Sequence, residues 1–156
     1  MIEVDIPDFG RLTIEHLVLD YNGTIAIDGE LIEGVAHRLK RLSEDIQIHV
    51  VTADTFGKAR DRLAGLSVKL SILDVEEQAQ AKARYVESLD AERTVAIGNG
   101  RNDRLMMESA RLGIVILEGE GCSVETLKAA EVCIRSSTEA LDLILHPKRL
   151  IATLRS

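Results

Sequence analysis

The chain has no tryptophan, two cysteines and two prolines among its 156 residues, and only 3% of its residues are aromatic. So few aromatic side chains argue against the stacking platforms that bind single-stranded nucleic acid. The formal net charge is −7, whereas a nucleic-acid-binding domain carries a basic surface. We therefore expect no nucleic-acid partner.

Long apolar runs and a secretory signal are also missing. Runs such as residues 17–19 and 114–117 are far shorter than the roughly 20 residues that cross a bilayer. The acidic N-terminus lacks a basic n-region. Cys122 and Cys133 have neither metal-ligand nor CxxC spacing, which favours buried, reduced thiols. We expect a cytoplasmic protein with no membrane partner.

Hydrophobic residues make up 46% of the chain and charged residues 29%, which suits one globular domain over residues 1–156. Short β-branched runs alternate with amphipathic stretches, and this alternation predicts an α/β fold around a parallel sheet. Strands are expected at residues 17–19, 49–51, 68–73, 94–97, 114–117 and 132–134. Helices are expected at residues 32–42, 57–64, 75–86, 123–129, 138–145 and 147–154, with one more capped by Asn102.

The first 14 residues have a different pattern. Ile2, Val4 and Ile6 alternate with polar residues, and after the turn at residues 7–10 Leu12 and Ile14 alternate again. Alternation on both sides of a short turn predicts an antiparallel hairpin, added at the edge of the sheet.

Three of the expected strands end abruptly in polar residues. Asp20 follows the run 17–19, Thr52 follows the run 49–51, and Asp103 lies in the turn after residues 94–97. The carboxyl ends of parallel strands line one crevice. We therefore expect these three side chains to converge.

The residues around these strand ends suit phosphoryl chemistry. A rigidly held carboxylate such as Asp20 can attack phosphorus, and Gly23 lets backbone N–H groups approach phosphoryl oxygens. Thr52 can donate a hydrogen bond, and Lys82 can neutralise negative charge. Taken singly, each has an ordinary alternative: a turn-capping Asp, a common strand-end Thr, and a lysine whose ammonium reaches solvent.

The segment from Gly98 to Asp103 is the most specific. Two glycines make a tight turn directly after a strand, and oxygen-bearing side chains follow at Asn99, Asn102 and Asp103. Oxygen ligands of this kind suit Mg²⁺. The alternative is a plain turn that leads into a capped helix.

Together, these segments resemble the haloacid dehalogenase superfamily of phosphohydrolases, and most of all small proteins related to the phosphorylation domain of P-type ATPases. The family's Asp-x-Asp-Gly-Thr motif corresponds to residues 20–24, its strand-end Thr or Ser to Thr52, its lysine to Lys82, and its Gly-Asp-Gly-x-Asn-Asp motif to residues 98–103. The resemblance implies a three-layer Rossmann-like fold.

The resemblance also implies roles for individual residues. It makes Asp20 the nucleophile and gives catalytic roles to the residues at the positions of Asn22, Thr52 and Lys82. The implied Mg²⁺ ligands are Asp20, the backbone carbonyl of Asn22, Asn99 and Asp103. The implied phosphate-binding residues are Gly23, Thr24, Thr52, Ala53 and Lys82.

Two positions depart from the family pattern. Asn22 stands where the phosphatases carry an Asp that acts as general acid and base, a function whose loss costs about 10²–10⁴-fold in rate. Asn99 stands where a carboxylate normally binds the metal. We therefore expect slow turnover and weaker metal binding.

The spacing of the motifs leaves no room for a cap domain. Between Thr24 and Thr52 there are 27 residues, and between Thr52 and Lys82 there are 29. The expected helices and strands use both stretches, so the crevice should be open. A flap at residues 25–31 or a second copy of the chain would cover it; alternatively, the substrate is a macromolecule.

We expect a Mg²⁺-dependent phosphohydrolase that forms an aspartyl phosphate and acts on a small phosphorylated substrate. The first alternative is a binding or regulatory module that keeps the fold without turnover. The second is a phosphotransferase that passes the phosphoryl group to a partner.

Overall fold

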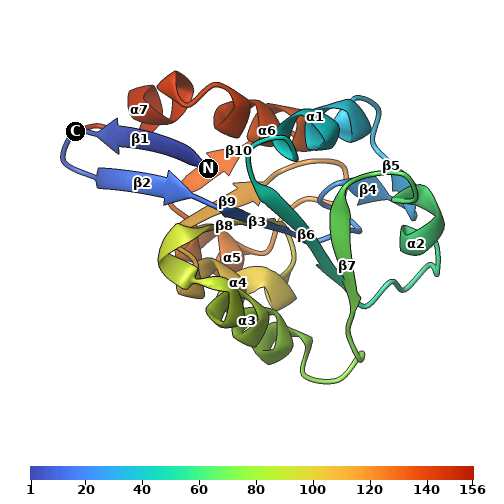
Figure 1. Cartoon of the computed structure of the whole chain (residues 1–156). Coiled ribbons are helices and arrows are strands. Elements are labelled where there is room, and N and C mark those ends of the chain that lie inside the picture. Colours follow the sequence, from blue (N-terminus) through green and yellow to red (C-terminus); the bar gives the residue numbers. More distant parts are fainter.

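The computed structural model describes all residues, 1–156, and its centre is a six-stranded sheet (Figure 1). The strand order is β10-β9-β8-β3-β6-β7, and every neighbouring pair is parallel, as predicted. The strands are β3 (His16–Leu19), β6 (Gln47–Thr52), β7 (Val68–Ile72), β8 (Thr94–Gly98), β9 (Leu112–Ile116) and β10 (Val132–Ile134).

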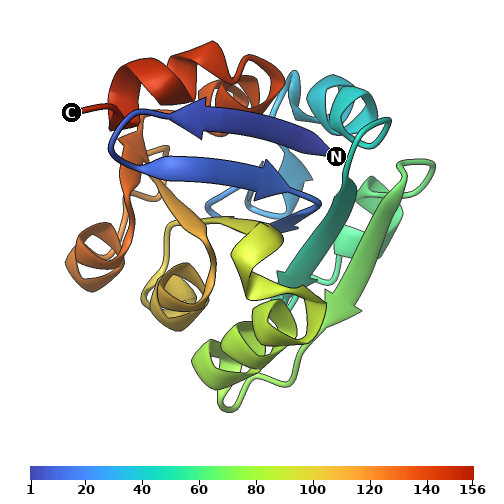
Figure 2. The same ribbon diagram turned by 60° about the vertical axis from the view of Figure 1, so that its left-hand side comes forward.

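Helices cover both faces of this sheet, which gives the three layers visible in Figures 1 and 2. One face carries α1 (Val35–Leu42), α6 (Ser137–Leu145) and α7 (Lys148–Leu154). The other carries α3 (Gln78–Leu89), α4 (Arg104–Ser109) and α5 (Val124–Ala129). The short helix α2 (Ala59–Arg62) lies beside β7, and 3₁₀ turns occur at Ala91–Arg93 and Arg101–Asp103.

Side-chain alternation along the strands divides the apolar core between the two faces. Leu17 and Leu19 of β3 belong to a 28-residue cluster that includes residues of α1 and α6. Val18 between them belongs to a second cluster with Val86 of α3 and Met106 of α4. The near-continuous apolar strands predicted from the sequence are therefore buried on both sides.

The N-terminal hairpin is present: β1 (Ile2–Ile6) pairs antiparallel with β2 (Gly10–Ile14). It forms its own two-stranded sheet and is not hydrogen-bonded into the six-stranded one, so its predicted position at the edge of the main sheet is wrong. The chain bends at Glu15 and enters β3 at its amino end, so the hairpin packs against α7 (Figure 2). The hairpin therefore lies away from the carboxyl ends of the parallel strands.

No cap domain is inserted, as predicted. The stretch between Thr24 and Thr52 forms a small flap of β4 (Ala26–Ile27) and β5 (Glu30–Leu31), followed by α1 and β6. The stretch between Thr52 and Lys82 forms α2, β7 and the first turn of α3.

Three local predictions are wrong. Helix α3 begins at Gln78, and Val75 is 78% exposed in the preceding loop. Asn102 does not cap α4, because its side chain donates a hydrogen bond to Gln78 and a 3₁₀ turn precedes the helix. The cysteines are not buried: Cys122 is half-buried in the loop before α5, and Cys133 is exposed because β10 lies at the edge of the sheet; both thiols are free.

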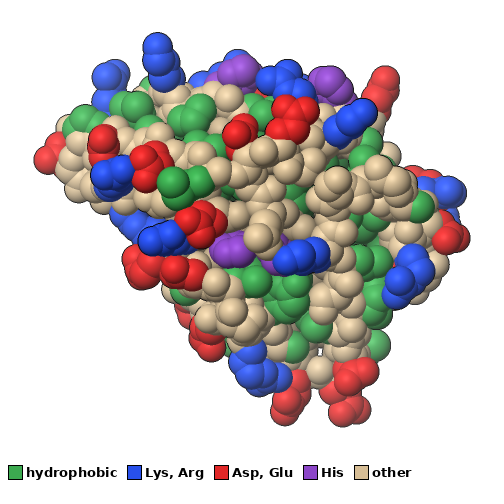
Figure 3. Space-filling view, in the orientation of Figure 1, with side chains coloured by type: hydrophobic (Ala, Val, Ile, Leu, Met, Phe, Trp, Pro, Cys, Tyr) green, Lys and Arg blue, Asp and Glu red, His purple; other side chains and the backbone are tan.

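Two further observations concern the surface and the helices. In Figure 3, acidic and basic side chains are interspersed over the face shown, without a continuous basic patch. None of the helices combines the length and the hydrophobicity that crossing a bilayer requires.

Candidate active site

The candidate site lies where three neighbouring strands end. Leu19 of β3 pairs with Val50 of β6 and Ile97 of β8, so Asp20, Thr52 and Asn99 follow at the same edge of the sheet. A cavity of about 160 Å³ lies over these strand ends. Its lining residues are Asp20, Asn22, Thr52, Ala53, Thr55, Gln78, Asn99, Gly100, Asn102 and Glu120.

Lys82 joins two of the converging residues. Its Nζ atom lies 2.7 Å from Oδ1 of Asp20 and 2.6 Å from Oδ1 of Asp103. The side chains of Lys82 and Asp103 have no exposed surface. A buried ammonium needs such partners, and the alternative of a lysine that reaches solvent is contradicted.

Burial and charge shift the pKa values of this cluster. Burial, reinforced by the carboxylate of Asp103, raises the pKa of the Asp20 carboxyl to about 6, although Lys82 opposes the shift. Burial acts to lower the pKa of Lys82, but the carboxylates of Asp103 and Asp20 outweigh it and raise that pKa. Two carboxylates share one ammonium, so the cluster is short of positive charge.

Asp103 fixes the turn after β8. Its Oδ2 atom accepts the backbone N–H groups of Asn99 at 3.0 Å and Gly100 at 2.9 Å. A Cβ atom on Gly98 would lie 2.5 Å from the same oxygen, so only glycine allows this approach. Both oxygens of Asp103 are therefore engaged within the chain, one by Lys82 and one by the turn.

The remaining oxygens at the strand ends fit a hard cation. The Thr24 hydroxyl lies 3.5 Å from Oδ2 of Asp20 and 3.3 Å from Oδ1 of Asn99. Because it has a single proton to donate, it can satisfy only one of these two oxygens at a time. The backbone carbonyl of Asn22 accepts no hydrogen bond from the chain. Carboxylate, amide and carbonyl oxygens are the ligands that Mg²⁺ prefers. The Asp20 carboxylate, the backbone carbonyl of Asn22 and the Asn99 side-chain oxygen therefore form a ligand set that fits this ion.

Asn22 lines the cavity but is also tied to the flap. Its Oδ1 atom accepts the backbone N–H of Gly29 at 3.1 Å, in the turn between β4 and β5. The Tyr21 hydroxyl donates to the carbonyl of Gly29 at 2.9 Å. With the oxygen of Asn22 engaged, its Nδ2 group is left to face a ligand in the cavity.

Thr52 and the loop behind it form the opposite wall. The Thr52 hydroxyl oxygen accepts the N–H of Asp54 at 3.0 Å, which leaves its own proton for a ligand. Asp54 has a φ of 48° and accepts the N–H groups of Lys58 and Ala59, so the loop is locally fixed. The N–H of Ala53 donates to no group of the chain.

Sequence reasoning did not single out three residues of the cavity wall: Thr55, Gln78 and Glu120. They lie in loops or at a helix start, where no periodic pattern gives their direction.

Gly23 has a φ of 81° and is also a point of close approach between two loops. A Cβ atom on Gly23 would lie 2.4 Å from Oε2 of Glu120 and 2.5 Å from Nδ2 of Asn99. The flap loop and the loop after β9 therefore meet closely at Gly23.

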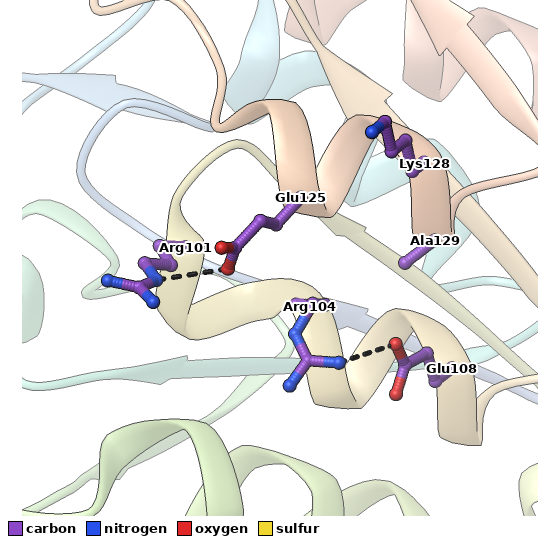
Figure 4. A pocket seen from close by; sticks show the side chains of 6 residues that line it. All are labelled: Arg101, Arg104, Glu108, Glu125, Lys128 and Ala129. Carbon is purple, nitrogen blue, oxygen red and sulfur yellow. Dashed lines mark hydrogen bonds and ion pairs between the residues drawn. The ribbon is translucent and has the colours of Figure 1, made fainter.

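A larger hollow of about 490 Å³ lies between α4 and α5 (Figure 4). Its arginines are paired on the surface: Arg101 with Glu125 at 3.0 Å and Arg104 with Glu108 at 2.8 Å. Asp20, Thr52 and Asn99, which line the smaller cavity over the strand ends, do not line this hollow. We therefore assign the candidate site to the smaller cavity.

Comparison with known proteins identifies relatives and a shared fold, although no family model matches the chain. Over 79 residues, 48% of the chain, it is 38% identical to the uncharacterised protein MJ0073 of Methanocaldococcus jannaschii and covers 85% of that protein. Over 159 residues it is 26% identical to a cadmium, zinc and cobalt-transporting ATPase of Bacillus subtilis, covering 94% of this chain and 22% of the ATPase.

A solved structure has the same fold. It is the 3-deoxy-D-manno-octulosonate 8-phosphate phosphatase of Moraxella catarrhalis, in complex with magnesium, phosphate and a KDO molecule. The TM-score is 0.72 at 18% identity, over 91% of this chain and 94% of the phosphatase. The chain therefore belongs to the same family as the Methanocaldococcus jannaschii protein. It has the fold of solved hydrolases of the haloacid dehalogenase superfamily, such as one from Legionella pneumophila, with a TM-score of 0.70 at 17% identity over 90% of this chain and 87% of that one.

Proposed function

We propose that the protein is a magnesium-dependent phosphohydrolase in which Asp20 forms an aspartyl phosphate. The observation that carries the proposal is the buried ion-pair cluster of Asp20, Lys82 and Asp103 beneath a small polar cavity. A phosphatase of the same fold binds magnesium and phosphate, and a transport ATPase is similar over most of the chain. Both likenesses support phosphoryl transfer as the class of reaction.

In the first step, a carboxylate oxygen of Asp20 attacks phosphorus and forms a P–O bond. The bond from phosphorus to the leaving group breaks, and the leaving group keeps the electron pair. The Lys82 ammonium, the Thr52 hydroxyl and the N–H of Ala53 hold the phosphoryl oxygens, with Gly23 and Thr24 at the opposite side. Mg²⁺ held by Asp20, Asn22 and Asn99 would supply positive charge for the phosphoryl oxygens.

In the second step, water attacks phosphorus, the bond to Asp20 breaks, and the carboxylate is regenerated. The proton of the water leaves with the phosphate or the solvent, because Asn22 cannot accept it. Nor can the amide of Asn22 protonate a leaving oxygen in the first step. We therefore propose that acyl and aryl phosphates, whose leaving groups depart without a proton, react faster than alkyl phosphates.

A cavity of about 160 Å³ accommodates a phosphoryl group together with a small leaving group, so we propose a small phosphorylated substrate. Two exposed apolar side chains are close in sequence to lining residues: Phe56 follows Thr55, and Val75 precedes Gln78 by three residues. We propose that a second copy of the chain covers these two side chains, which light scattering of the purified protein tests.

The test of the proposed function compares wild type with Asp20→Asn and Asp5→Asn. Asp5 is exposed on the distant hairpin and serves as the matched control. With acetyl phosphate and Mg²⁺, wild type and Asp5→Asn should release phosphate equally, and Asp20→Asn should lose turnover. Wild-type protein no faster than Asp20→Asn would instead support a binding or regulatory module.

A further inference from the structure

Asn99 fastens the loop after β9 to the candidate site. Its side-chain Nδ2 atom donates to the carbonyl oxygen of Gly121 at 3.0 Å, and its backbone carbonyl accepts the N–H of Ser123 at 2.8 Å. The same loop is wedged against the flap, since a Cβ atom on Gly119 would lie 2.9 Å from Cδ1 of Ile27. Two anchors at residue 99 and one packing contact therefore set the path of residues 117–123.

The first anchor requires an amide. An aspartate at position 99 in the same rotamer would place a carboxylate oxygen against the Gly121 carbonyl oxygen, where Nδ2 now donates. Two acceptors at this separation repel each other. The loop path is therefore linked to the loss of the carboxylate that the family pattern has at this position.

The loop brings a different carboxylate to the cavity. Glu120 lines it together with Asp20, which is more than nine-tenths buried. Oε2 of Glu120 and Oδ1 of Asn99 lie 2.4 Å and 2.8 Å from one point, the place of a Cβ atom on Gly23. Glu120 makes no hydrogen bond or ion pair with the rest of the chain, although ten other carboxylates form ion pairs. Two of those ten, Asp20 and Asp103, belong to the candidate site.

We propose that Glu120 is a ligand of the divalent cation bound by Asp20 and Asn99. The inference rests on the proposed function, whose metal site it completes. The carboxylates of Asp20 and Asp103 and the ammonium of Lys82 together carry one net negative charge. Glu120 raises this to two negative charges, which a divalent cation neutralises. The carboxylate missing at Asn99 is thus supplied from a neighbouring loop that the Asn99 amide holds in place.

Mg²⁺ binding in the absence of any substrate tests this inference. Isothermal titration calorimetry with Mg²⁺ alone compares the Mg²⁺ affinities of wild type, Glu120→Gln and Glu76→Gln. Glu76 is exposed, forms no ion pair and precedes Gln78 of the cavity wall by two residues, so its variant removes the same charge without removing a lining carboxylate. Glu120→Gln should weaken Mg²⁺ binding at least about tenfold, and Glu76→Gln should leave it unchanged.

Equal Mg²⁺ affinity in wild type and Glu120→Gln would overturn the inference, and so would equal weakening in both variants. Far-UV circular dichroism and the metal-free Tm establish that Glu120→Gln is folded. Because the titration needs no turnover, its outcome is separate from that of the proposed function. A wild type that binds Mg²⁺ through Glu120 but hydrolyses nothing would refute only the phosphohydrolase proposal.

Discussion

Asn22 accepts the backbone N–H of Gly29 through its side-chain oxygen at 3.1 Å, so the residue that replaces the family's acid is also a support of the flap. A carboxylate oxygen can accept the same N–H group. The structure therefore tolerates an aspartate at this position, with its second oxygen toward the cavity.

The first prediction follows from this tolerance. Asn22→Asp should speed hydrolysis of alkyl phosphates by about 10²-fold, because it provides a general acid and base. The gain should be much smaller for acetyl phosphate, whose leaving group needs no proton. Steady-state phosphate release with the two substrates measures both effects; an equal gain or no gain on the alkyl phosphate would contradict the proposed role of position 22.

The same substitution at position 99 should destabilise the fold. Asn99→Asp replaces the donor that faces the Gly121 carbonyl by an acceptor, which should lower the free energy of unfolding by about 1–3 kcal/mol. Asn22→Asp is the matched control, because it also introduces one carboxylate before a glycine at the same cavity. Urea unfolding with a chelator present compares them; equal stability of the two variants would refute the argument that the loop depends on an amide.

Removing Lys82 should destabilise the fold more than any exposed lysine does. Lys82→Gln leaves Asp20 and Asp103 buried without their cation, and breaking a buried ion pair costs about 3–5 kcal/mol. Lys128→Gln, in the hollow of Figure 4, removes an exposed lysine that forms no ion pair. If chemical denaturation gave both variants similar midpoints, the buried cluster would not have the energetic importance argued above.

The pKa of Asp20 gives a prediction for pH. Its value of about 6 in the folded protein exceeds the 3.8 of an unperturbed aspartate, so the folded state binds this proton more tightly than the unfolded chain. The contribution of Asp20 to stability is therefore complete below pH 3.8 and is lost as pH rises through 6. In metal-free buffer, the free energy of unfolding of wild type relative to Asp20→Asn should fall between pH 4 and pH 7. A difference that stays constant or grows over this range would contradict the raised pKa.

The sequence was sufficient to predict the sheet and part of the site. Asp20 and Thr52 each follow an apolar strand directly. The prediction that they meet depends on a general property of parallel sheets, namely that the carboxyl ends of the strands share one edge. The same property predicted the approach of Asp103. These residues converge in the structure because β8, β3 and β6 are neighbours.

Other features depended on contacts between distant segments. The helical pattern alone could not distinguish a charge-neutralising Lys82 from a lysine whose ammonium reaches solvent, since only the carboxylates of Asp20 and Asp103 make its burial favourable. Glu120 reaches the cavity because Asn99 holds its loop, and no local pattern encodes that contact. Likewise, alternation predicted the N-terminal hairpin, but the bend at Glu15 decided that it packs against α7 instead of extending the sheet.

The central claim is that Asp20 itself takes the phosphoryl group. Wild-type protein mixed with acetyl phosphate and Mg²⁺, quenched in acid within the first turnover and analysed by peptide mass spectrometry, should carry one phosphoryl group on Asp20. Asp20→Asn should carry none. Hydrolysis of acetyl phosphate by wild type without phosphorylation of Asp20, or at an equal rate by Asp20→Asn, would contradict the account.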